Sequence, residues 1–121
     1  MQYALLIYGD ERAIANASPE AAQEEMDEYW KYEAWLGEKG TKLGGEALHD
    51  TSQATTVRVR DGEALTTDGP FAETKEQLGG FYLLECANLD EALEAAAKCP
   101  GSWRGSVEVR PVMVFEQGAP Q

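Results

Sequence analysis

The sequence predicts a single α+β domain in which a four-stranded antiparallel sheet carries two helices on one face. Its 121 residues and 13.2 kDa are enough for one packed core. Segments typical of strands and helices follow in the order strand, helix, strand, hairpin, strand, helix, strand. This is the order of a split βαβ unit with an inserted hairpin. We expect one domain over residues 1–116 and a flexible C-terminal tail over 117–121.

The first strand and the first helix have clear local signals. An apolar run over residues 3–8 is typical of a central strand that is covered on both faces. Ser18 and Pro19 indicate a helix start, because serine caps the free N–H groups of the first turn and proline favours the first helical position. The helix is expected to run to about Glu38, since Gly40 can take the positive φ of a helix end.

This helix has an apolar stripe at 100° per residue, made of Ala22, Met26, Tyr29 and Leu36, with Trp30 at its edge. Glu33 falls in the middle of the stripe. Because an unpaired buried charge is costly, its carboxylate must reach solvent or a subunit boundary, find a partner, or sit buried with a raised pKa.

A short strand over residues 41–47 comes next, followed by the inserted hairpin. The dipeptide Asp61-Gly62 separates two β-prone runs, residues 55–60 and 63–67. A two-residue Asp-Gly loop in this setting is the strongest short-range hairpin signal.

The remaining chain repeats the pattern of strand, helix and strand. A polar loop over 72–79 leads into an apolar strand over 81–86. Asn88 can cap the second helix, whose buried stripe is expected to consist of Leu89, Ala92, Leu93 and Ala96. The last strand covers residues 106–115, and Pro111 places it at an edge or at a bulge because proline cannot donate to a ladder.

Two helices can cover only one face of such a sheet. In the strands over 3–8 and 81–86, both the odd-numbered and the even-numbered positions are mostly apolar, and these positions point to opposite faces of the sheet. The face without helices would therefore be a large exposed apolar patch. Monomeric soluble proteins avoid such patches. We therefore expect a two-fold homodimer through the sheet faces, which meet like halves of a barrel.

Charge and composition exclude several classes of partner. Ten Lys plus Arg against 22 Asp plus Glu give a net charge of −12, which repels phosphate backbones and anionic membranes. No signal peptide or apolar run of membrane-spanning length is recognisable, so a cytoplasmic protein is expected. Two cysteines without a CxxC pair and the single His49 predict no metal site, and no tightly bound cofactor is expected.

Residues 68–82 read DGPFAETKEQLGGFY, a run that resembles the signature of the YCII-related proteins of the DGPF type. Stretches at 5–9, 56–62 and 107–112 agree, so the resemblance covers nearly the whole chain up to Phe115. It implies a ferredoxin-like domain that forms a dimeric α+β barrel, in bacterial proteins mostly of undetermined function. Many of these proteins are encoded near extracytoplasmic-function sigma factors.

The resemblance also implies candidate chemistry. The wider YCII group has been proposed to be enzymatic, on the strength of a histidine in the first helix and an aspartate in a following loop. Tyr29 stands at the position that best corresponds to the histidine, and Asp68 is the nearest counterpart of the aspartate. Because a phenol and an imidazole differ widely in pKa, a His/Asp mechanism does not carry over intact.

The residues themselves suggest an acid/base set. Tyr29 and Glu33 lie four positions apart on one helical face, towards which the loop from Asp68 can fold back. The expected catalytic residues are Tyr29, Glu33, Asp68 and Lys75, and the expected ligand-binding residues are Glu73, Thr74, Glu76 and Arg110.

Each assignment has a structural alternative. The Asp68 carboxylate can instead cap the turn that it begins. Residues 73–76 can form a solvated loop, and Arg110 can pair with Glu108 on the same strand face instead of holding an anionic substrate.

Two functions fit these residues. One is a cofactor-independent enzyme that performs acid/base chemistry on a small organic molecule in a cleft. The other is a non-catalytic regulatory module that binds a ligand or a protein, associated with extracytoplasmic-function sigma factor systems. The enzyme hypothesis predicts a partly buried Glu33 or Asp68 that faces a concave, water-accessible pocket.

Overall fold

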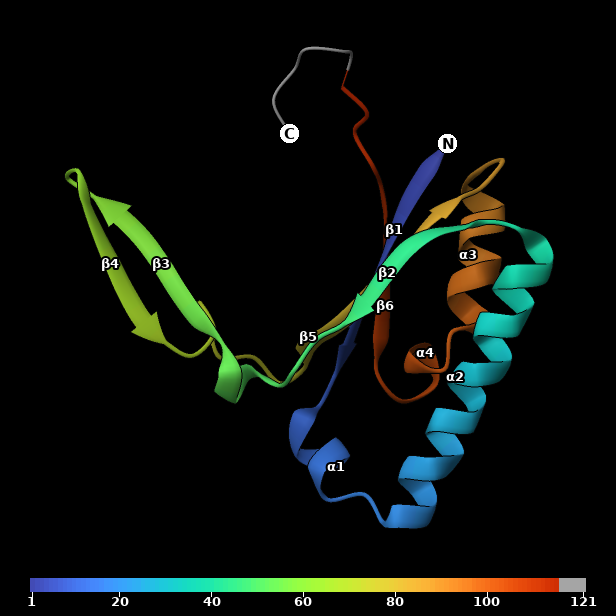
Figure 1. Ribbon diagram of the computed structural model, residues 1–121, viewed down its shortest axis with the longest axis horizontal. Helices are drawn as coiled ribbons and strands as arrows, with labels where there is room; N and C mark the ends of the chain where they lie inside the picture. Colours follow the sequence, from blue (N-terminus) through green and yellow to red (C-terminus); the bar gives the residue numbers. More distant parts are fainter. Residues whose placement is uncertain (116–121) are drawn as a thin grey trace.

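The computed structural model describes residues 1–115, and it has the predicted split βαβ architecture (Figure 1). The four strands of the main sheet are β1 (Gln2–Gly9), β2 (Lys42–Ala47), β5 (Gln77–Glu85) and β6 (Ser106–Pro111). They lie in the order β2-β5-β1-β6 with antiparallel neighbours, which is the ferredoxin-like order. The expected tail over 117–121 lies outside the described residues.

Helix α2 (Pro19–Lys39) begins and ends as predicted. Ser18 Oγ accepts a hydrogen bond from the Ala21 N–H at 3.1 Å, and Gly40 ends the helix with a φ of 67°. The apolar stripe was predicted less well. The buried residues of α2 are Tyr32 and Leu36, whereas Met26 and Trp30 of the predicted stripe are exposed. The rest of the domain therefore covers mainly the second half of this helix.

Helix α3 (Leu89–Lys98) begins at the predicted cap, where Asn88 Oδ1 accepts from the Glu91 N–H at 2.9 Å. Its buried residues are Ala92, Ala95 and Ala96. The prediction that Leu89 and Leu93 are buried was wrong, because alanines make the close contact with the sheet and both leucines face outward.

Three short elements have no counterpart in the sequence prediction. They are α1 (Glu11–Ala15), the 3₁₀ turn η1 (Thr51–Gln53) and α4 (Gly101–Arg104). Asp10 caps α1 by accepting from the Arg12 N–H at 2.9 Å. Each element packs where the chain leaves or enters the sheet, so it depends on contacts between distant segments.

The inserted hairpin consists of β3 (Thr55–Arg60) and β4 (Glu63–Asp68), as predicted. Asp61 and Gly62 have φ values of 53° and 76°, the positive values that a two-residue type I′ turn requires. The hairpin forms a separate two-stranded sheet and projects away from the helices (Figure 1).

Two strand boundaries differ from the prediction. β5 starts at Gln77, so the polar connecting loop runs over residues 69–76. β6 pairs with β1 alone and ends at Pro111, which confirms it as an edge strand. Residues 112–115 do not continue it as a strand.

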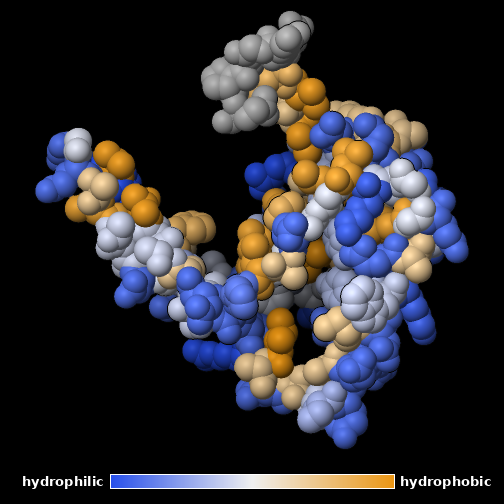
Figure 2. Space-filling model, in the orientation of Figure 1, coloured by the Kyte–Doolittle hydropathy of each residue, from blue (hydrophilic) through white to orange (hydrophobic). Residues whose placement is uncertain are grey.

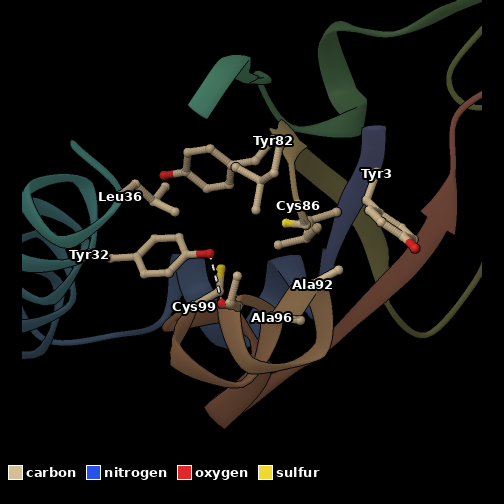
Figure 3. Packing of buried hydrophobic residues seen from close by; sticks show 11 residues of the cluster. Tyr3, Tyr32, Leu36, Tyr82, Cys86, Ala92, Ala96 and Cys99 are labelled. Carbon is tan, nitrogen blue, oxygen red and sulfur yellow. Dashed lines mark hydrogen bonds between the residues drawn. The ribbon is translucent and has the colours of Figure 1, made fainter. Parts of the chain in front are cut away.

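The two faces of the main sheet have different surroundings. On one face the helices bury a core that includes Tyr3, Leu5, Tyr32, Leu36, Tyr82, Leu84, Ala92 and Cys99 (Figure 3). On the other face, which we call the open face, the opposed pairs are Leu6 with Phe81 and Ala4 with Leu83. These four residues are only partly buried. The prediction that the strands are apolar on both faces is confirmed.

Candidate functional site

A groove of about 400 Å³ lies between α1 and the loop over residues 69–76. Its walls include Arg12, Thr51, Pro70, Glu73, Thr74 and Lys75. A volume of this size suits a small organic molecule, since ligand pockets commonly occupy roughly 300–1,000 Å³.

Glu11 holds the groove together from the start of α1. Its carboxylate accepts hydrogen bonds from the Thr51 N–H at 2.8 Å and from Thr51 Oγ1 at 2.6 Å. Its own N–H donates to Gln77 Oε1 at 3.0 Å. One residue therefore joins η1, α1 and the beginning of β5, and its carboxylate is occupied in doing so.

Three charged side chains of the groove have no such structural task. Arg12, Glu73 and Lys75 are exposed, and within residues 1–115 none of them takes part in a salt bridge. The groove therefore offers two cations and one carboxylate for contact with a bound molecule.

Glu33 lies elsewhere, between α2 and the edge of the sheet. Its carboxylate accepts from Lys42 Nζ at 2.8 Å and from Tyr82 Oη at 2.7 Å. Burial acts to raise the pKa of Glu33, but these two hydrogen bonds outweigh it and lower the pKa below its ordinary value. Of the three alternatives given for Glu33, the structure shows the one in which the carboxylate finds a partner, and not the one in which it is buried with a raised pKa.

Tyr29 packs against the core from the preceding turn of α2. Its hydroxyl lies 3.9 Å from Cys99 Sγ. Burial, together with Cys99, raises the pKa of Tyr29, so the phenol stays protonated at neutral pH. It cannot act there as a base in its resting state.

Asp68 is the last residue of β4 and is exposed. Within the described residues its carboxylate makes no hydrogen bond, so the alternative of a capped turn is not what the structure shows. Asp68 belongs to the base of the hairpin, far from α2 in Figure 1. Neither it nor Glu33 is among the residues that line the groove.

The remaining predicted ligand-binding residues have partners within the chain. Ser106 Oγ donates to Glu76 Oε1 at 2.8 Å. Arg110 Nη2 donates to Glu108 Oε2 at 2.7 Å on the exposed side of β6, as the structural alternative predicted. The structure thus gathers Glu73, Thr74 and Lys75 in one groove and leaves the other predicted residues outside it.

Sequence reasoning missed the contributions of Arg12, Glu11 and Tyr82. A signal for α1 was present, because an aspartate that follows Gly9 is a common helix cap. Tyr82 had no signal of its own, since only the packing of β5 under α2 brings its hydroxyl to Glu33.

Two kinds of feature are absent from the described part of the chain. Residues 1–115 hold no cluster of three or more His, Cys, Asp or Glu side chains placed for a metal ion. Nor do they form a helix that is long and apolar enough to cross a membrane.

Comparison with known proteins gives the family. A profile of the YCII-related domain matches residues 1–116. An uncharacterised protein of Rhizobium meliloti (strain 1021) is 44% identical, over 98% of this chain and 97% of its own length.

Among solved structures, the chain is similar to 5-chloro-2-hydroxyhydroquinone dehydrochlorinase (TftG) from Burkholderia phenoliruptrix AC1100, in complex with 2,5-dihydroxybenzoquinone. The TM-score is 0.49 at 16% sequence identity, and the match covers 93% of this chain and 94% of that one. The profile match over residues 1–116, together with the 44% identical relative, shows that the chain belongs to the YCII-related family.

Proposed function

We propose that this protein binds a small organic molecule in the groove between α1 and the loop over 69–76 and transfers a proton to or from it. The observation that carries the proposal is the presence of three unpaired charges, on Arg12, Glu73 and Lys75, along a groove of ligand size. Side chains without internal partners can redirect to a ligand at little cost in lost interactions.

The chemistry follows from the side chains available. The Glu73 carboxylate accepts a proton from the substrate, and the Lys75 ammonium group stabilises the negative charge that remains on a substrate oxygen. Arg12 orients the molecule, and the Thr74 hydroxyl, whose hydrogen is donated to the Glu76 carbonyl, can only accept a hydrogen bond from it. No bound cofactor is needed for a transfer of this kind.

Tyr29 and Glu33 do not take part in the proton transfer proposed here, and neither lines the groove. Both oxygens of Glu33 already accept hydrogen bonds, and the pKa of Tyr29 is raised by its burial. A group in either condition is poorly suited to accept a proton from a substrate.

The proposed functional unit is a homodimer through the open faces. The open face presents Leu6, Phe81, Ala4 and Leu83 side by side. A contiguous apolar surface of this kind is typical of an interface between subunits. An isologous pairing would place the same residues of both copies against one another.

A ligand screen tests the groove. Thermal unfolding is measured with a panel of small carboxylic acids and phenols, for the wild type, Lys75→Gln, Glu73→Gln and the control Glu63→Gln. Glu63 is an exposed carboxylate on β4 and does not line the groove. We expect at least one compound to raise the Tm of the wild type and of the control, and to do so far less for the two groove variants.

Proton transfer has its own test. A stabilising compound is incubated with the protein in D₂O, and deuterium incorporation at carbon is followed by NMR. Incorporation that depends on Glu73 supports the enzyme. Binding with no incorporation contradicts catalysis and favours the second candidate, a regulatory module that only binds its ligand, which is consistent with the positions of Glu33 and Asp68 outside the groove. If no compound stabilises the wild type, the groove proposal itself fails.

A further inference from the structure

The charged side chains that line the groove fall into two sets. One set has partners in its own chain, since the Glu11 carboxylate accepts two hydrogen bonds and Asp10 Oδ1 accepts from the Arg12 N–H at 2.9 Å. The other set is exposed and makes no salt bridge within residues 1–115; it consists of the side chains of Arg12, Glu73 and Lys75. The second set is therefore the one that can select a ligand.

The two walls that carry this second set are joined by one side chain. Gln77 Oε1 accepts from the Glu11 N–H of α1 at 3.0 Å, and Gln77 Nε2 donates to the Thr74 carbonyl of the loop. Glu73 and Lys75 are the neighbours of Thr74 in the chain. Because their backbone is held relative to α1, the walls lose little conformational freedom when a ligand binds.

The charges of the groove limit the charge of its ligand. Because Asp10 and Glu11 already accept hydrogen bonds, the free charges are two cations and one carboxylate, a surplus of one positive charge. A single carboxylate on the ligand matches this surplus. A phosphate ester or a dicarboxylate would bring a second negative charge to a chain whose net charge is −12. The groove therefore favours a monoanion.

The lining of the groove is polar, with a small apolar part. Hydrophilic side chains predominate at the base of the hairpin, next to α1 (Figure 2). Pro70 and Ala72 supply apolar contact, and within residues 1–115 the lining holds no aromatic side chain. An aromatic ligand would find no ring to stack on in this groove. A short aliphatic chain therefore suits the lining better than an aromatic ring.

Each free group suits a different part of an organic acid. The planar guanidinium of Arg12 fits a carboxylate through two parallel hydrogen bonds. The Lys75 ammonium group is a compact point charge, which suits a single oxygen that becomes negative. The Glu73 carboxylate can only accept a hydrogen bond or a proton. A short acid with a keto group beside its carboxylate contains all three complements, because the keto group also acidifies the neighbouring C–H bond.

We propose that the substrates of this groove are short aliphatic 2-oxo acids, from which the protein removes a proton at C3 and to which it returns one. The inference rests on the proton transfer proposed above and names its substrate class. Glu73 takes the proton, the C–H electron pair forms the C2–C3 double bond, and the keto oxygen becomes an enolate oxygen beside Lys75. Return of a proton from Glu73 to C3 restores the 2-oxo acid, so no co-reactant is consumed.

Three probes that differ by one group separate the contacts. 2-Oxobutanoate carries all the groups, butanoate lacks the keto oxygen, and butanone lacks the carboxylate. NMR titration gives their dissociation constants for the wild type, Arg12→Met, Lys75→Met and the control Arg60→Met, at an exposed arginine outside the groove. We expect the wild type to bind 2-oxobutanoate at least about tenfold more tightly than the other two probes. Arg12→Met should lose the preference over butanone, Lys75→Met should lose the preference over butanoate, and the control should keep both.

Exchange of the C3 protons of 2-oxobutanoate in D₂O, followed by NMR, tests the reaction. The wild type and the control Glu63→Gln should exchange them at least about 100-fold faster than Glu73→Gln does. Glu73→Gln should still bind 2-oxobutanoate, because the contacts of its carboxylate and its keto oxygen are made by Arg12 and Lys75.

Failure of the substrate class differs from failure of the groove. The class is overturned if 2-oxobutanoate does not bind, if its C3 protons exchange no faster than with Glu73→Gln, or if Arg12→Met and Lys75→Met weaken all three probes equally. The groove proposal stands in each of these cases when another carboxylic acid or a phenol stabilises the wild type and not the groove variants. If no compound stabilises the wild type, both fail.

Discussion

The two faces of the main sheet use alternate residues of the same strands, yet only one face has a cover. In β5, Tyr82 and Leu84 pack under the helices, whereas Phe81 and Leu83 point to the open face. Strands whose residues are apolar on both sides are typical of sheets that are covered on both faces. This difference between the two faces is the observation that supports the proposed pairing of two chains through their open faces.

The largest expected effect is on the covered face. Leu84→Ala should lower the free energy of unfolding by about 3 kcal/mol, because Leu84 is fully buried and the core cannot close around the lost atoms. Leu43→Ala, at a residue that is 54% exposed on β2, should change it by less than about 0.5 kcal/mol. Urea unfolding at one fixed protein concentration measures both, and equal losses would remove the distinction between buried and exposed leucines.

On the open face the same residue type should matter for association. Leu83→Glu should weaken the dimer about 100-fold or more, because the interface would bury an unpaired carboxylate from each copy. Leu83→Met keeps the volume and should leave the dissociation constant almost unchanged. Light scattering with a circular dichroism spectrum separates dissociation from unfolding, and a Leu83→Glu variant that remains a dimer would contradict the pairing.

Glu33 lies beside the edge of the covered face, and its substitution should have a smaller, pH-dependent effect on the free energy of unfolding. Its pKa is lowered in the folded state, so its stabilising contribution is present above the ordinary glutamate pKa and is lost as the pH falls through the folded value. Glu33→Gln should cost about 1 kcal/mol at pH 7, and this cost should shrink as the pH falls through the lowered pKa of the folded state.

Glu38→Gln is the matched control for that experiment, since Glu38 is exposed on the same helix. Its carboxylate makes no salt bridge within residues 1–115, so Glu38→Gln should change the free energy of unfolding by less than about 0.5 kcal/mol at pH 7. A constant cost of Glu33→Gln at every pH would mean that the carboxylate charge does not stabilise the fold.

The smallest effect on the free energy of unfolding is expected in the first half of α2, where the helix is exposed. Met26→Ala should change the free energy of unfolding by less than about 0.5 kcal/mol, because Met26 is half exposed in spite of its place in the predicted stripe. Chemical denaturation checks this value. A loss above about 2 kcal/mol would show that this part of α2 is covered in the folded protein.

These corrections show what sequence reasoning could predict. Turns and caps were predicted from local chemistry, as at Ser18, Asp61-Gly62 and Asn88, because the residues that form them are neighbours in the chain. The choice of Tyr32 over Met26 as a buried residue depends on how far the sheet and α3 extend beside α2, which periodicity does not reveal.

In the candidate site, too, local groupings were predicted correctly and groupings that depend on the path of the chain were not. Glu73, Thr74 and Lys75 were predicted together because they belong to one loop, and they share one groove. Tyr29, Glu33 and Asp68 were grouped by an expected fold-back of the chain, and the hairpin carries Asp68 away from α2 instead (Figure 1). Arg12 and Glu11 were not predicted because they line the groove from α1, a short helix that depends on contacts with distant residues such as Thr51.

The mass of the wild-type protein in solution tests the central claim most directly. Sedimentation equilibrium at micromolar concentration should give twice 13.2 kDa, with the amides of the open-face strands β1 and β5 protected from exchange. A mass of 13.2 kDa at all concentrations, with those amides exchanging freely, would contradict the account.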